Sequence, residues 1–71
     1  MENKKENFKR IAKNRTNRII ELISKLQNLS NTSFYEYTDE QIEVIFDAIQ
    51  RELDKQRQQF KHNKDNRKFV L

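Results

Sequence analysis

The 71-residue sequence contains no glycine, no proline and no cysteine, and it has one histidine. Tight turns between strands favour residues that tolerate a positive φ, so the absence of glycine argues against a β-rich fold. The absence of cysteine excludes disulfides and thiolate metal ligands. No apolar run exceeds three residues, far below the ~20 that span a bilayer. The sequence therefore predicts a helical, soluble, cytoplasmic protein with no membrane partner.

Catalytic constellations are also missing from the sequence. Without glycine the chain cannot form a glycine-rich phosphate loop, and no nucleophile, base and orienting acid can be grouped from its residues. His62 stands between Lys61 and Asn63, where a solvated side chain is the simpler interpretation. We predict a protein that is not an enzyme and that has no cofactor, no metal site and no small-molecule substrate.

Apolar residues recur every three or four positions in two segments, which is the period of one face of an α-helix. The first stripe predicts a helix over residues 4–28, and the second predicts a helix over residues 39–61. Residues 62–71 lose this period and are predicted to form a basic tail. The first stripe is Phe8, Ile11, Ala12, Ile19, Leu22, Ile23, Leu26 and Leu29, and the second stripe is Ile42, Ile45, Phe46, Ile49, Leu53 and Phe60.

Residues 29–38 form a predicted elbow between the two helices. Thr38 and Gln41 have the spacing of a capping box, in which each side chain bonds the backbone of the other residue. Because the elbow has no glycine, Asn28 or Asn31 is expected to take the left-handed conformation that ends many helices.

A chain of this length buries too little apolar surface to be very stable alone. We therefore predict an all-α fold with one domain over residues 1–71: an antiparallel two-helix hairpin, completed as a four-helix bundle by dimerisation or by a partner protein.

Charge falls into three blocks of alternating sign. Residues 1–28 carry a net +5, residues 29–54 carry −6 and residues 55–71 carry +5. An antiparallel hairpin would bring the two basic blocks to one end, which can attract phosphates. The alternative is that these charges only keep a small helical protein soluble. The predicted nucleic-acid-binding residues are Lys9, Arg10, Lys13, Arg15, Arg18, Lys55, Arg57 and Lys61.

Arg15 is unusual because it falls within the first apolar stripe. One interpretation is a polar layer with Glu52 and Gln56 that fixes the register of the hairpin at some loss of stability. The other is an arginine available to a phosphate or to the carboxylate of a partner.

Aromatic and acidic residues gather around the elbow. The aromatic rings could stack on bases, but the neighbouring acids would repel phosphates, so we favour a role in capping a bundle or in binding a protein. The predicted partner-binding residues are Phe34, Tyr35, Tyr37, Glu40, Glu43 and Asp47.

Four segments carry a family resemblance: Arg15-Thr16-Asn17-Arg18-Ile19, Asn28-Leu29-Ser30-Asn31, Tyr35-Glu36-Tyr37-Thr38 and Ile45-Phe46-Asp47-Ala48-Ile49. Together they resemble short uncharacterised helical proteins carried on plasmids, phages and other mobile elements of low-GC bacteria. The resemblance implies a context of replication, transfer, defence or counter-defence, and it assigns no functional residues.

These observations lead to one principal hypothesis, an accessory protein of a mobile element that associates with nucleic acid through its basic end, beside a larger DNA-processing protein. The alternative is a protein-binding module or inhibitor of a nucleic-acid enzyme that uses the acidic, aromatic elbow. A purely structural bundle subunit is the third possibility.

Overall fold

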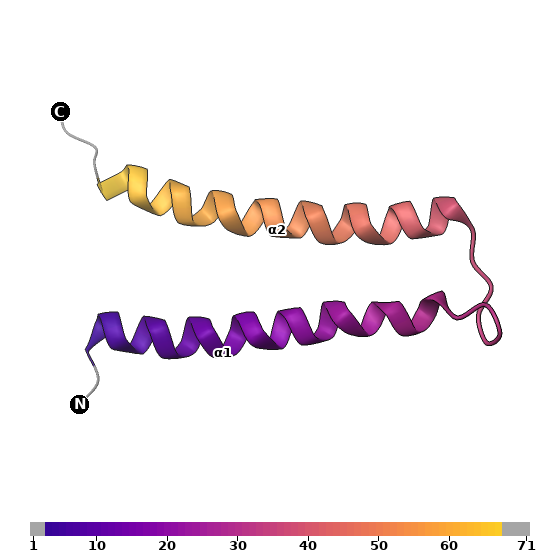
Figure 1. The fold of residues 1–71 in the computed structure, drawn as a ribbon. Helices are drawn as coiled ribbons and strands as arrows, with labels where there is room; N and C mark the ends of the chain where they lie inside the picture. The colour runs from indigo at the N-terminus through magenta and orange to yellow at the C-terminus, as the bar shows by residue number, and fades with distance from the viewer. Residues whose placement is uncertain (1–2, 68–71) are drawn as a thin grey trace. The chain divides into compact units, whose positions relative to one another are not determined.

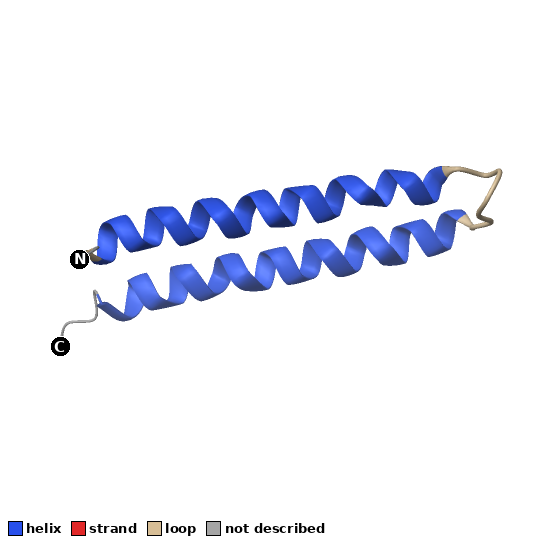
Figure 2. Cartoon of the chain, turned by 90° about the horizontal axis from the view of Figure 1, so that it is seen from below, coloured by secondary structure: helices blue, strands red, loops and turns tan. Residues whose placement is uncertain are grey.

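The computed structural model describes residues 3–67, with side chains through residue 63. Three helical elements make up most of this range: α1 (Lys4–Ser24), the short 3-10 helix η1 (Lys25–Ser30) and α2 (Asp39–Arg67) (Figure 1). No strand occurs within the described range (Figure 2). The prediction of an all-α fold with two principal helices is confirmed.

The chain divides into two units, Met1–Glu36 and Tyr37–Leu71. The first contains α1 and η1, and the second contains α2. The antiparallel hairpin and the four-helix bundle stay predictions.

Helix α1 begins with a side-chain cap on its first turn. The Asn3 side-chain oxygen accepts a hydrogen bond from the backbone N–H of Glu6 at 2.8 Å. The Asn3 carbonyl accepts a second bond, from Asn7 N–H, at 2.9 Å. Asparagine is a favoured N-cap because its short side chain satisfies an N–H group that has no partner within the helix.

The α-helical part of the first segment ends at Ser24, earlier than the predicted residue 28, and continues as η1. The Ser24 hydroxyl donates to the carbonyl of Glu21 at 2.7 Å, and the Ser30 hydroxyl donates to the carbonyl of Gln27 at 2.6 Å. Serine hydroxyls that bond a carbonyl three residues back compete with the α-helical pattern. A 3-10 turn is a common way for an α-helix to end.

Asn31 shapes the turn that follows η1, but not in the way we predicted. Its backbone is extended, with φ −72° and ψ 104°, and no described residue has a positive φ. The Asn31 side-chain oxygen accepts a bond from Ser33 N–H at 2.9 Å, and its carbonyl accepts bonds from Phe34 and Tyr35 N–H. The prediction of a left-handed asparagine was wrong because these bonds, together with η1, turn the chain without one.

Helix α2 begins at the predicted residue and runs farther than predicted. The capping box is confirmed by hydrogen bonds between Thr38 and Gln41 in both directions. The helix extends to Arg67, six residues past the predicted end at residue 61, so residues 62–67 of the predicted tail are helical. Only Lys64 and Arg67 of these six residues are strong helix formers. The helix nevertheless continues, because extending an existing helix avoids the cost of starting one. Residues 68–71 of the predicted tail lie outside the described residues.

The two apolar stripes carry the least exposed side chains. No described side chain is buried. The partly buried ones are all apolar and all belong to a stripe, whereas Phe46 and Leu53 remain half exposed. Both helices therefore keep an apolar face that a partner can cover. The partly buried residues are Ile11, Ala12, Leu26, Ile42 and Ile49.

Candidate functional site

Helix α1 carries four of the predicted basic residues outside its apolar stripe, and their side chains are exposed to solvent. Lys9, Arg10, Lys13 and Arg18 are all exposed, and the rise of an α-helix places the first and last of them about 14 Å apart. The Arg10 guanidinium donates to the side-chain oxygen of Asn7 at 2.9 Å. Within the described residues, Lys9, Lys13 and Arg18 form no ion pair, so their charge is not neutralised locally.

Arg15 lies in the first stripe between Ile11 and Ile19, and it is exposed. The residues predicted to pair with it bond each other: the Gln56 amide donates to the Glu52 carboxylate at 3.0 Å. The polar layer with Arg15 stays a prediction.

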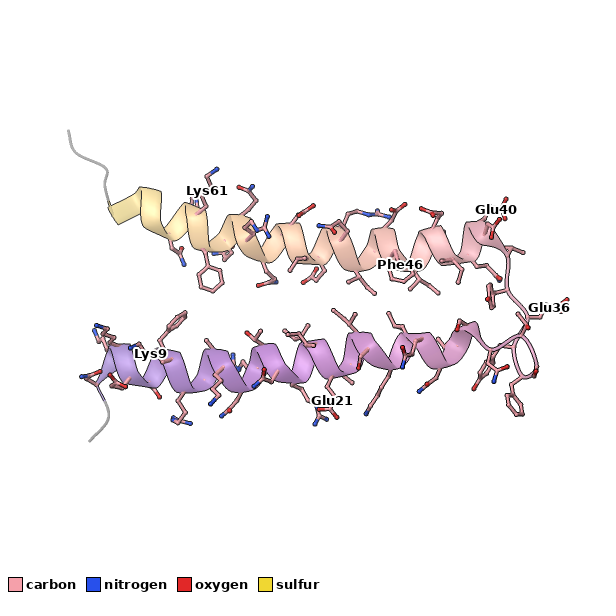
Figure 3. The ribbon with its side chains drawn as sticks, in the orientation of Figure 1. Lys9, Glu21, Glu36, Glu40, Phe46 and Lys61 are labelled. Atoms are coloured by element: carbon pink, nitrogen blue, oxygen red, sulfur yellow. The ribbon has the colours of Figure 1, made fainter. Side chains whose placement is uncertain are left out.

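The second basic set belongs to the last part of α2, where Lys55, Arg57 and Lys61 are exposed; Lys61 is labelled in Figure 3. The nearby carboxylates bond glutamine amides in place of these cations. Gln50 donates to Asp54 at 3.1 Å, just as Gln56 donates to Glu52. None of the three cations forms an ion pair with a residue that the structure describes, so all three can meet an external anion.

Charge reverses along α2. Residues 39–54 contain six acids and one arginine, whereas residues 55–67 contain five basic residues and one acid. Asp39 and Glu40 stand in the first turn, where the positive end of the helix dipole stabilises carboxylates, and the basic part stands at the negative end. The helix is therefore strongly dipolar, with an acidic start and a basic end.

The elbow presents aromatic side chains from an ordered turn. Phe34 is 79% exposed and Tyr35 is 49% exposed, and their backbone N–H groups are both held by the Asn31 carbonyl. Tyr37 belongs to the second unit and is also exposed. An exposed aromatic pair on a fixed turn is a suitable anchor for a protein partner.

The predicted acidic residues of α2, Glu40, Glu43 and Asp47, are exposed. Figure 3 shows Glu40 on the side of the helix away from Phe46. Their spacing of three and four residues places all three on the polar side of the helix, outside the second stripe.

One residue that shapes the chain was missed in the sequence, and a second was expected in the wrong conformation. Asn3 caps α1, and the spacing of Asn3 and Glu6, which is that of a capping box, was the available signal. Asn31 was identified as a turn residue, but the bonds that its side chain and carbonyl make in an extended conformation have no pattern of their own.

Comparison with protein-family models, curated proteins and solved structures gives no match. Among the described helices, none is long and apolar enough to cross a membrane. The described residues also include no cluster of three or more metal-ligating side chains.

Proposed function

We propose that this chain is a non-enzymatic accessory protein of a mobile genetic element that associates with nucleic acid beside a larger DNA-processing protein. The observation that carries the proposal is the set of exposed cations on helical backbone, since Lys9, Lys13, Arg18, Lys55, Arg57 and Lys61 form no ion pair with any described residue. Phosphate attraction needs such uncompensated charge and requires no catalytic group.

The proposal includes an antiparallel hairpin of α1 and α2. The segment between η1 and α2, residues 31–38, is short, and short connections usually join antiparallel neighbours. In that arrangement residues 1–18 and 55–71 come to the same end and together carry +10. The half-exposed stripes of both helices support completion of the hairpin as a four-helix bundle by a second copy or by a partner protein.

A salt titration tests the proposal. We expect binding to duplex DNA, single-stranded DNA and RNA, measured by fluorescence anisotropy, to weaken steeply with salt. Each phosphate contact contributes about −0.9 to the log-log slope on duplex DNA and about −0.7 on single strands. An affinity that does not change between low and moderate salt would overturn the proposal, as would an absence of binding at low salt.

A second function is favoured by the exposure of Phe34, which is the most exposed of the large apolar side chains described. A ring held out on an ordered turn, next to the acidic start of α2 in the sequence, suits a protein partner with a basic and apolar surface. The chain would then act as a protein-binding module or as an inhibitor of a nucleic-acid enzyme.

A further inference from the structure

One edge of α2 carries four charged residues placed at equal distances on either side of residue 50. Asp39 and Glu43 are four residues apart, Arg57 and Lys61 are four residues apart, and both pairs are equally distant from residue 50. At 3.6 residues per turn, the fourteen residues from Glu43 to Arg57 span close to four turns. All four residues therefore lie along the same edge of the second stripe, with acids at one end and bases at the other.

We infer that α2 pairs with α2 of a second copy of this chain in an antiparallel, two-fold symmetric arrangement. A two-fold axis beside residue 50 would place the acidic part of each edge against the basic part of the other. Glu43 of one copy then lies opposite Arg57 of the second, and Asp39 opposite Lys61. Opposite charges at such flanking positions set orientation and partner choice in helical pairs.

The apolar residues of α2 fit a two-fold axis one residue away. A register with Ile49 of one copy opposite Leu53 of the second also sets Ile42 opposite Phe60, because both pairs are centred on residue 51. Phe60 is 67% exposed, so this pairing covers a ring that is otherwise in water. The apolar and charged residues therefore indicate axes one residue apart, and registers that differ by two residues, about 3 Å along the helices.

Charge favours a second α2 as the occupant of this edge. The basic residues of α1 are concentrated at its start, so an antiparallel α1 would bring Lys9 and Lys13 to the basic end of α2. An antiparallel second α2 would instead bring Asp39 and Glu43 to the basic end of the first. The four charged edge residues are all exposed, and Arg57 and Lys61 form no ion pair with a described residue, so the edge is available.

The inference deepens one part of the proposed function, the completion of the bundle, and names its partner as a second copy. It does not require nucleic acid. Arg57 and Lys61 belong to both surfaces, so phosphates and the second copy would compete for them.

A charge swap tests the pairing with the full chain and without nucleic acid. Glu43→Lys places like charges opposite Arg57 of the second copy, and Arg57→Glu places like charges opposite Glu43, twice in each symmetric dimer. We expect either variant alone to raise the dimer dissociation constant about tenfold, measured by sedimentation equilibrium. An equimolar mixture should recover the original dissociation constant as a heterodimer, because every edge pair is again complementary.

Glu40→Lys is the matched control. It makes the same charge change one turn away, on the side of α2 opposite the stripe, and we expect it to leave the dissociation constant unchanged. Circular dichroism on each variant verifies that helicity is kept. A monomeric native chain, equal effects of Glu43→Lys and Glu40→Lys, or a mixture that fails to recover dimerisation would each overturn the inference. Because no nucleic acid is present, none of these outcomes bears on the phosphate contacts.

Discussion

Thr38 and Gln41 bond each other's backbone in both directions. The Thr38 N–H donates to the Gln41 side-chain oxygen at 2.8 Å, and the Gln41 N–H donates to the Thr38 hydroxyl at 3.1 Å. The Thr38 carbonyl also accepts the first helical bond, from Ile42 N–H, at 3.2 Å. These bonds determine where α2 begins, and therefore which side chains form its apolar stripe and its charged edge.

Replacing the cap should destabilise α2. We expect Thr38→Ala to lower the free energy of unfolding by about 1 kcal/mol, because it removes the acceptor of the Gln41 N–H. Thermal unfolding followed by circular dichroism measures the change. Thr32→Ala, a threonine in the turn before the cap, is the control and should have a much smaller effect. Equal melting temperatures for the two variants would contradict the importance of the capping box.

The Asn31 turn gives a prediction for local dynamics. Asn31→Ala removes the oxygen that accepts the Ser33 N–H at 2.9 Å, but it keeps the carbonyl that holds Phe34 and Tyr35. Amide hydrogen exchange, followed by NMR, should therefore become faster at Ser33 and change little in α2. Asn31→Asp keeps an acceptor and should preserve protection at Ser33. Unchanged exchange in Asn31→Ala would show that this bond does not order the turn.

The sequence was most informative where one physical rule acts alone. The apolar period identified both helices, and the spacing of Thr38 and Gln41 identified the start of α2. Helix ends were harder to predict because several weak effects compete there. The Ser24 hydroxyl adds a bond to the Glu21 carbonyl where α1 ends and η1 begins. By contrast, α2 continues past Phe60 as the extension of an existing helix.

The candidate site was predictable only as a set of residue types. Spacing assigned Lys9 and Lys13 to a helix, and the structure adds that both are exposed and form no ion pair with a described residue. A ligand cannot be inferred from such a pattern, because phosphate attraction requires charge density and no defined geometry.

Removing cations from α1 should reduce the salt dependence of nucleic-acid binding. We expect Lys9→Gln and Lys13→Gln together to lower the magnitude of the log-log slope on duplex DNA by about 1.8, since each contact contributes about 0.9. Lys25→Gln is the matched control, because Lys25 lies 3.7 Å from the Glu21 carboxylate and outside the predicted set. An equal loss of slope in the control would assign the effect to net charge alone.

The elbow can be tested separately from the basic residues. If Tyr35 and Tyr37 bind a protein partner, the double change Tyr35→Ala and Tyr37→Ala should weaken capture of that partner at least tenfold, because truncated aromatic anchors typically cost more than 1 kcal/mol each. Helicity should remain, since neither residue lies in α1 or α2. The comparison uses native and variant chains as bait, with Val44→Ala, an exposed apolar residue of α2, as the control. Equal capture by the native and double-variant chains would count against the elbow.

Substitution of Arg15 distinguishes a structural role for this residue from a role in phosphate binding. Its charge lies in the first stripe between Ile11 and Ile19, so covering that stripe would remove the guanidinium from water. We expect Arg15→Met to raise the free energy of unfolding by about 1 kcal/mol, since apolar side chains of similar size often stabilise such positions. Chemical denaturation measures this change, and the slope of the salt titration should not move. Lys13→Met removes a charge from the polar side of α1 and should show the reverse pattern: unchanged stability and a smaller slope. A smaller slope without a gain in stability in Arg15→Met would instead make Arg15 a phosphate contact.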